Sequence, residues 1–262
     1  MSHTHITSGL QHLEPGACIR RHRHAVGYVA LLAEGGYTEA GDRGRFSVQP
    51  GEVVLHHAHE AHQDLTTRSR TLVLNLPLPD LSFTPGHYEC SLGEEVLRLA
   101  RTDPVAAAEA MLAGLRPAPR LVPDWPDLLA EELRSDSDLT IAEWASAHGL
   151  APQSVSRGFR QVFGVSPKRF RAETRALRAV ETLRTSRMGL ADLAFSLGFA
   201  DQSHLTRAVK TLTGSSPGRF ARAAAPAART VDRSRVATSA SRREDPQGAV
   251  ERRRADRPLR RP

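Results

Sequence analysis

The chain of 262 residues contains only two cysteines, Cys18 and Cys90. Two cysteines cannot form the disulfide framework of a small secreted protein, so we expect a reducing, cytoplasmic location. The sequence has no run of about 18 apolar residues, which disfavours a membrane-spanning helix and a membrane partner. The opening segment MSHTHITSGLQHLE lacks the charged and apolar regions of a signal peptide. Aromatic residues make up 5% of the chain, which disfavours a stacking surface for single-stranded nucleic acid.

Charge is distributed unevenly along the chain, whose formal net charge is +7. Residues 1–137 hold 12 basic and 18 acidic residues, whereas residues 138–222 hold 13 basic and 6 acidic ones. Residues 223–262 add 11 basic and 5 acidic residues. This asymmetry indicates a polyanionic partner for the back half only, with a basic solvated surface as the plainer alternative.

Composition and hydrophobic periodicity change along the chain, and these changes predict four segments. Residues 1–90 show short apolar runs between Gly, Pro and Asp turns, which is typical of β structure. Residues 91–135 are expected to form a helical connector followed by a proline-rich, stiff linker. Residues 128–222 are predicted to be almost entirely helical, and residues 136–222 of them to form a double helix-turn-helix domain. Residues 223–262 are predicted to be a disordered, Arg-rich tail whose charges are either solvated or in non-specific contact with phosphates.

The helical segment contains an internal repeat. Residues 155–170, VSRGFRQVFGVSPKRF, align with residues 205–220, LTRAVKTLTGSSPGRF, at an offset of fifty residues. Six of these sixteen positions are identical, and they include both turn-forming and core positions. Just upstream, GLAPQS at 149–154 matches GFADQS at 198–203 with an offset one residue shorter. One supersecondary unit therefore occurs twice.

Each copy is predicted to be a short helix, a glycine turn and a second helix. In the first copy, Thr140 and Glu143 have the spacing of a capping box, and Gly149 suits the turn. In the second copy, Gly198 makes the turn and Asp201 begins the following helix. Apolar residues at helical spacing predict the inward stripes Val155, Phe159, Val162 and Phe163, and Leu205, Val209 and Leu212.

The opposite faces of these two second helices are polar and basic. A helix-turn-helix places such groups in the major groove, where arginine can donate to guanine and glutamine can pair with adenine. Serine, threonine and lysine suit phosphate or mixed contacts. We therefore predict contacts with double-stranded DNA at Gln153, Ser154, Ser156, Arg157, Arg160, Gln202, Ser203, Thr206, Arg207 and Lys210. A helical repeat that packs for structure alone is the alternative, and it leaves these outer faces without a role.

A helix over residues 170–186 is predicted to join the two units. Its apolar positions fall on one side and many arginines on the other. About 17 helical residues span roughly 25 Å. With its flanking helices, this segment could hold the two reading helices about one DNA turn, about 34 Å, apart.

Residues 136–222 resemble the DNA-binding domain of the AraC/XylS family of bacterial transcription regulators. The residues that carry the similarity are LTIAEWASAHGL, SRGFRQVFGVSPKRF, LADLAFSLGFADQSHLTRAVK and GSSPGRF. The resemblance implies that the two outer faces read bases. Ala151 and Ala200 stand where the family usually has a capping serine, and Val209 and Thr213 replace common aromatic residues. These departures are expected to lower the stability of the second unit without touching its outer face.

The front half is rich in histidine, with six of the twelve histidines between residues 22 and 62. Gly16, His22 and His24, followed by PGEV at 50–53 and His62, are spaced like the two cupin motifs. The resemblance implies a small β-barrel as the sensor domain. It also matches His22, His24 and His62 to the ligand positions of metal-binding cupins, which suggests Zn, Fe or Ni as a cofactor. Tyr28 replaces the glutamate of that ligand set.

Other residues near these motifs carry weaker expectations. Strand alternation places Cys18 on the same side as His22 and His24, which predicts a sulfur near the site. His56, His57 and His59 are expected to be loop residues. An organic-ligand pocket, or a set of surface histidines, is the alternative to a metal site.

The predicted fold is therefore multidomain, a small cupin-like N-terminal β-barrel followed by an all-α double helix-turn-helix. The predicted function is sequence-specific regulation of transcription, with activation as one form of it. The protein is expected to sense a small molecule or a metal and not to be an enzyme. A metal-dependent cupin enzyme fused to a DNA-binding domain is one alternative, and an effector-independent DNA-binding regulator is another. The resemblance also allows a homodimer through helices at 93–134 and a contact with RNA polymerase. The sequence does not distinguish activation from repression.

Overall fold

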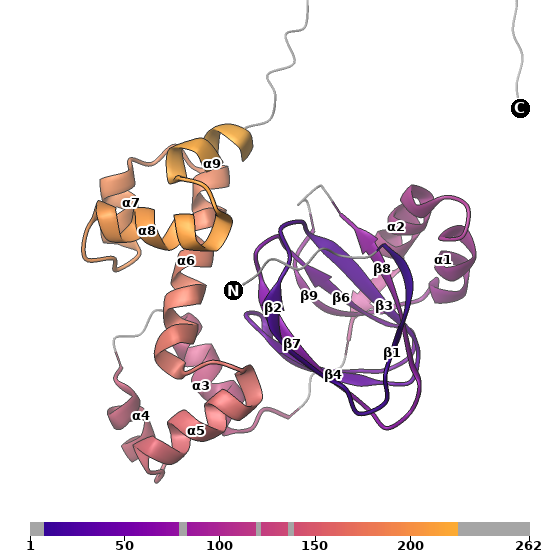
Figure 1. The fold of residues 1–262 in the computed structure, drawn as a ribbon, viewed down its shortest axis with the longest axis horizontal. Coiled ribbons are helices and arrows are strands. Elements are labelled where there is room, and N and C mark those ends of the chain that lie inside the picture. The colour runs from indigo at the N-terminus through magenta and orange to yellow at the C-terminus, as the bar shows by residue number, and fades with distance from the viewer. Residues whose placement is uncertain (1–7, 79–82, 119–121, 136–138, 225–262) are drawn as a thin grey trace, which may run out of the picture. The chain divides into compact units, whose positions relative to one another are not determined.

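The computed structural model describes residues 8–78, 83–118, 122–135 and 139–224 (Figure 1). Its N-terminal part is rich in strands and its C-terminal part is helical, as the sequence predicts. The predicted Arg-rich tail lies outside the described residues, except for its first two positions, which end helix α9 (Pro217–Ala224). No helix in the described ranges is long and apolar enough to cross a membrane.

Two antiparallel sheets make up the β-rich part. The six-stranded sheet has the order β1 (Gly9–Leu13), β8 (Thr71–Pro77), β3 (Tyr28–Glu34), β6 (Glu52–His56), β9 (Gly86–Cys90), β10 (Leu115–Pro117). The four-stranded sheet has the order β2 (Cys18–Arg23), β7 (Ala61–Thr66), β4 (Tyr37–Gly41), β5 (Gly44–Val48). The strands form two separate sheets rather than one closed barrel, so the expected cupin-like barrel is not confirmed.

Strand β3 is buried on both faces, and its alternation separates two apolar clusters. Val29 and Leu31 pack in a cluster with Val96 of helix α1 (Gly93–Leu99) and Met111 of helix α2 (Pro104–Ala113). Its other face, which includes Leu32, packs in a second cluster with Tyr37 of β4 and Val48 of β5. The second cluster therefore joins the two sheets, and the side chains between them form the interior of the β-rich part.

The predicted proline-rich linker contains regular structure. Strand β10 pairs with β9 at the edge of the six-stranded sheet, where Pro117 can end the ladder. Helix α3 (Trp125–Arg134) begins within the predicted linker and carries Pro126 in its first turn. Its apolar face packs into the core of the helical part. The division of the chain into separate domains stays a prediction.

The helical part contains the two predicted helix-turn-helix units. The first consists of α4 (Ile141–Ala147) and α5 (Pro152–Phe163), and the second of α7 (Leu190–Ser196) and α8 (Gln202–Thr213). The predicted glycine turns are confirmed, because Gly149 and Gly198 have φ of 66° and 68°. The capping box of Thr140 and Glu143 is also present.

Helix α6 (Pro167–Thr185) joins the two units (Figure 1). Near its start, Phe170 packs in one cluster with Trp144, Phe159 and residues of α3. Further along, Leu177, Ala179, Val180 and Leu183 pack in a second cluster with α7 and α8. A helix of 19 residues is about 28 Å long, close to the length expected from the sequence.

Candidate nucleic-acid interface and histidine cluster

The predicted DNA-contacting residues lie on the solvent-facing sides of α5 and α8. Both helices bury an apolar stripe, formed by Val155, Phe159 and Phe163 in α5 and by Leu205, Val209 and Leu212 in α8. Burial of these stripes turns the polar sides outward. Thr206 is half-buried, and the other predicted residues are exposed: Gln153, Ser154, Ser156, Arg157, Arg160, Gln202, Ser203, Arg207 and Lys210. Their contact with DNA stays a prediction.

Structural equivalence between the two helices follows the offset of fifty residues. Helix α5 ends at the C-cap Gly164, and α8 ends at the C-cap Gly214. With these ends matched, Arg157 occupies the same helical position as Arg207. Ser156 likewise matches Thr206, Arg160 matches Lys210, and Gln153 matches Ser203.

The shorter offset of the upstream match has a structural cause. Helices α4 and α7 begin at Ile141 and Leu190, which are forty-nine residues apart, whereas the helices after the turns are fifty apart. The turn of the second unit is thus one residue longer. Gln153 and Gln202, which align in the sequence, therefore occupy different helical positions.

A contact that the sequence reasoning missed stabilises the back of the first unit. Trp125 of α3 lies against Gly158 of α5, and a Cβ built on Gly158 would stand 2.6 Å from Cζ2 of the Trp125 ring. The equivalent residue in α8 is Ala208, at the same offset of fifty. A glycine within a helix can mark a place where a large side chain packs closely, so Gly158 could have indicated this contact. Its partner, Trp125, falls in the predicted linker.

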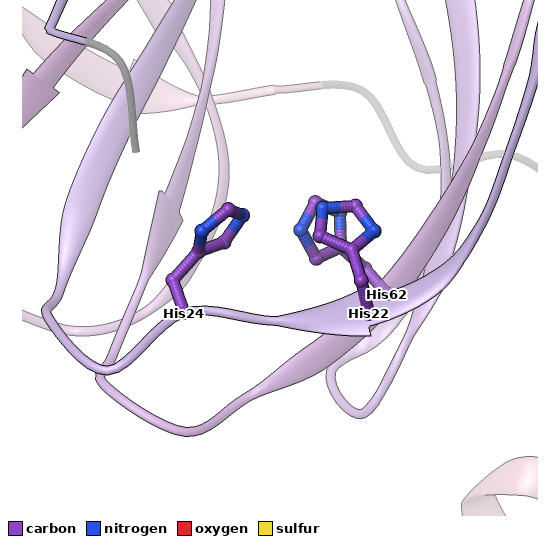
Figure 2. A group of neighbouring side chains, drawn as sticks. All are labelled: His22, His24 and His62. Atoms are coloured by element: carbon purple, nitrogen blue, oxygen red, sulfur yellow. The ribbon is translucent and has the colours of Figure 1, made fainter. Parts of the chain in front are cut away.

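The three predicted histidines come together between the two sheets. His22 of β2, His24 just beyond it and His62 of β7 line a cavity of about 240 Å³. Their rings project to the same side of the strands (Figure 2). The ring centroids of His22 and His62 are 4.4 Å apart, and those of His24 and His62 are 5.7 Å apart. One nitrogen of each ring lies within 4.8 Å of the others, which is compatible with a shared ligand.

Hydrogen bonds orient these rings, and burial and neighbouring charges shift the pKa values of His22 and His62. The hydroxyl of Tyr28 is 3.0 Å from Nε2 of His62, and Nδ1 of His22 is 3.0 Å from the carbonyl oxygen of Arg20. Burial lowers the pKa of His22, and the neighbouring His62 lowers it further. Burial also opposes the charged form of His62, but the carboxylates of Asp64 and Glu39 outweigh it and raise the pKa of His62 well above its usual value.

Two expectations about neighbouring residues are wrong. His56 is not a loop residue, because it ends strand β6 and its side chain is buried. His57 and His59 do lie in the loop that follows, although His59 is buried. Cys18 is exposed, because a register shift between Ile19 and His22 reverses the strand alternation on which the expectation rested.

Acidic residues of the same interior were not predicted. Glu39 of β4 and Asp64 of β7 pair across the four-stranded sheet, and both line the histidine cavity. Glu39 follows Tyr37 by two residues in a strand, so strand alternation placed it on the interior side. A buried carboxylate is uncommon without a partner, but the sequence does not show which distant residue supplies that partner.

Comparison with known proteins identifies the helical part. A family model described as a helix-turn-helix domain matches residues 144–223. The arabinose operon regulatory protein of Escherichia coli (strain K12) is 37% identical over 86 residues, which are 33% of this chain and 30% of that protein. The transcriptional activator NphR of Rhodococcus sp. is 30% identical over 90 residues, which are 34% of this chain and 27% of that protein.

A solved structure is similar to part of the chain. The C-terminal domain of AraT, a response regulator from Geobacillus stearothermophilus, is 22% identical with a TM-score of 0.39, and the match covers 45% of this chain and 98% of that one. The curated relatives are matched over less than a third of their own length. Residues 144–223 therefore match a helix-turn-helix domain, and this part of the chain is similar to regulators such as the arabinose operon regulatory protein.

Proposed function

We propose that this protein is a sequence-specific DNA-binding transcription regulator. The observation that carries the proposal is the equivalence of α5 and α8, which present Arg157 and Arg207 at the same helical position on exposed faces. An arginine in the major groove can donate two hydrogen bonds to one guanine, so each helix has a base-reading group at a defined place. The excess of basic residues over residues 138–222 supports phosphate contacts beside these arginines.

The β-rich part is the proposed sensor. Its interior cavity of about 240 Å³ is small beside the cavities of about 300–1,000 Å³ that hold drug-sized ligands, so it suits a small polar effector or an ion. Imidazole, carboxylate and phenol groups line it, and they can donate and accept hydrogen bonds. The resemblance of the histidine spacing to the cupin motifs supports the same role, although the strands do not close into a barrel.

A transition metal is one candidate for this sensor site. His22, His24 and His62 would hold it, since their nitrogens lie within 4.8 Å of one another. A bound metal would supply a positive charge that orders the strands carrying these residues. Tyr28 stands where metal-binding cupins carry glutamate, and its hydroxyl at 3.0 Å now engages Nε2 of His62. That hydrogen bond would have to open if Nε2 of His62 became a ligand.

Three further parts of the proposal rest on the resemblance to regulators of the AraC family. These are dimerisation through residues 93–134, contact with RNA polymerase and activation of transcription. The name of one relative, the transcriptional activator NphR, agrees with activation. If the purified protein is monomeric at the concentration that half-saturates its operator, dimerisation through residues 93–134 is excluded.

Footprinting on DNA around the protein's own gene tests the proposal, with and without candidate metabolites. We expect a protected segment that extends over two successive major grooves on one face of the duplex. Arg68→Ala, an exposed substitution outside the helical units and outside residues 93–134, is the matched control and should leave the footprint unchanged. Selection from random-sequence duplexes would extend the test to unlinked operators. Equal affinity for every duplex in that selection would contradict sequence-specific recognition.

A further inference from the structure

A second group of ligating side chains lies beside the histidine cavity. Glu39 of β4 and His62 of β7 come from the four-stranded sheet, and His56 of β6 comes from the six-stranded sheet. All three side chains are buried, with residue exposures of 3 to 5%. We propose that Glu39, His56 and His62 bind a Zn²⁺ ion that connects the two sheets. This site differs from the His22, His24 and His62 set and does not depend on the proposed DNA-binding function.

The distances between the ligand atoms match those around tetrahedral zinc. Oε2 of Glu39 lies 3.3 Å from Nε2 of His56 and 3.5 Å from Nδ1 of His62. Two ligands bound to zinc at about 2.0–2.1 Å with a tetrahedral angle are about 3.3–3.4 Å apart. The three atoms all lie within 4.8 Å of one another, so one ion can reach them after small side-chain adjustments. Oδ1 of Asp64 lies 3.2 Å from Nδ1 of His62, where it is a hydrogen-bond partner of that ring.

The contact between Glu39 and His56 joins the two sheets. Nε2 of His56 is buried and lies 3.3 Å from Oε2 of Glu39, which is ion-pair distance. An ion held by both atoms would replace this direct contact, since each atom can be a zinc ligand.

The electrostatics of this interior also favour a cation. Three buried carboxylates, those of Glu39, Asp64 and Glu60, surround the two imidazoles. Nε of Arg43 lies 2.5 Å from Oε1 of Glu60 and offsets one of these charges. A Zn²⁺ ion beside Glu39 and Asp64 would offset the negative charge of the other two.

The surroundings hold the proposed ligands in place. The Tyr28 hydroxyl lies 3.0 Å from Nε2 of His62, and Oδ1 of Asp64 lies 3.2 Å from Nδ1 of the same ring, so an ion at Nδ1 would replace the hydrogen bond to Asp64. Oε2 of Glu60 lies 3.9 Å from Nδ1 of His56, which is beyond hydrogen-bond distance. Gly41 pairs with His62, and a Cβ at Gly41 would stand 2.9 Å from the Cβ of His62, so the two strands approach closely here. These enclosed ligands describe a structural ion rather than a catalytic one.

Metal analysis of the full-length protein tests the proposal. After incubation with ZnCl₂ and dialysis, the wild type should hold about one equivalent of Zn²⁺. Glu39→Gln and His56→Gln should each reduce the bound zinc to background. His12→Gln changes an exposed histidine and is the matched control, and it should retain the ion. The double variant His22→Gln/His24→Gln should also retain it.

Two measurements on the wild type keep the test valid if a buried variant fails to fold. X-ray absorption at the zinc edge should show two imidazole ligands with oxygen ligands, whereas the His22, His24 and His62 set would show three imidazoles. Zinc should also raise the melting temperature of the wild type, because the ion binds only the folded chain. The proposal would be overturned if the folded wild type bound no more zinc than background. It would also be overturned if X-ray absorption showed three imidazole ligands, or if His22→Gln/His24→Gln lost the zinc.

Discussion

The two helix-turn-helix units have equivalent exposed faces but different apolar cores. The core of the first unit is aromatic, with Trp144, Phe159, Phe163 and Phe170 in one cluster. The core of the second is aliphatic and contains Leu193, Leu197, Leu205, Val209 and Leu212, with Phe199 at its edge. The exposed arginines nevertheless occupy the same position in both. Different side chains can therefore support one outer face, as long as the inward stripe and the turn are preserved.

The two units also differ in which of their helices has a side-chain cap. In the first unit, Thr140 caps α4 through a capping box, whereas the N-cap residue of α5, Ala151, offers no side-chain cap. In the second, the N-cap residue of α7, Gly189, offers no side-chain cap, whereas Asp201 caps α8 by accepting from the backbone nitrogen of His204 at 2.6 Å. Each unit therefore has one side-chain cap, on a different helix. The missing serine at Ala200 costs the second unit no cap, because the longer turn puts Asp201 at that position.

The largest difference between the units should appear in core truncations. Phe159→Ala should destabilise the protein by about 3–5 kcal/mol, because it removes a fully buried ring that contacts Phe163 and Phe170. Val209→Ala, at the equivalent position of the second unit, removes less volume and should cost less. Urea denaturation monitored by circular dichroism measures both. Equal losses would show that the aromatic core adds no stability to the first unit.

The next largest effect concerns the helix that packs behind the first unit. Gly158→Ala should cost about 1–3 kcal/mol, because the new Cβ would stand 2.6 Å from the Trp125 ring and would force it to move. The equivalent change in the opposite direction, Ala208→Gly, should cost about 0.5–1 kcal/mol through backbone entropy alone.

A double-mutant cycle with Trp125→Ala identifies the cause of the Gly158→Ala loss. If the clash is responsible, the cost of Gly158→Ala should largely disappear when the ring is absent. A cost that persists in the Trp125→Ala background would assign the effect to something other than this contact.

The smallest effect concerns the caps of the two predicted reading helices. Asp201→Ala should destabilise the protein by about 0.5–2 kcal/mol, because α8 loses its side-chain acceptor. Ala151→Asp should instead stabilise it by about 0.5–1 kcal/mol, since α5 gains the cap that it lacks. Thermal unfolding of the two variants measures the pair. Changes of the same sign would mean that capping does not distinguish the units.

The helical part could be predicted from the sequence because its signals are local. The apolar stripe of α5, the capping box at Thr140 and the turns at Gly149 and Gly198 each depend on residues within one or two helical turns. The offset of fifty residues then related one unit to the other. Only the start of helix α3 was misplaced, because Trp125 and Pro126 lie among prolines that predicted a linker up to residue 127.

The β-rich part was harder to predict because its arrangement depends on distant pairings. The spacing of His22, His24 and His62 correctly indicated that they meet in one cavity. The same spacing did not show that the strands form two sheets, or that a register shift places Cys18 on the outer side. Glu39 and His56 meet only through the packing of β4 against β6, and no local pattern encodes that packing.

The central claim is that Arg157 and Arg207 read bases at equivalent places in the two units. The most direct test compares operator and random-duplex affinities for Arg157→Ala, Arg207→Ala and the double variant at matched salt, with Lys210→Ala as a phosphate-contact control. We expect each arginine variant to lose about 1–3 kcal/mol on the operator and to relax one base pair, with the two positions about one helical turn apart. The two losses should nearly add, and melting temperatures should barely change. Equal losses on operator and random DNA would show that these arginines hold phosphates, and would contradict the account.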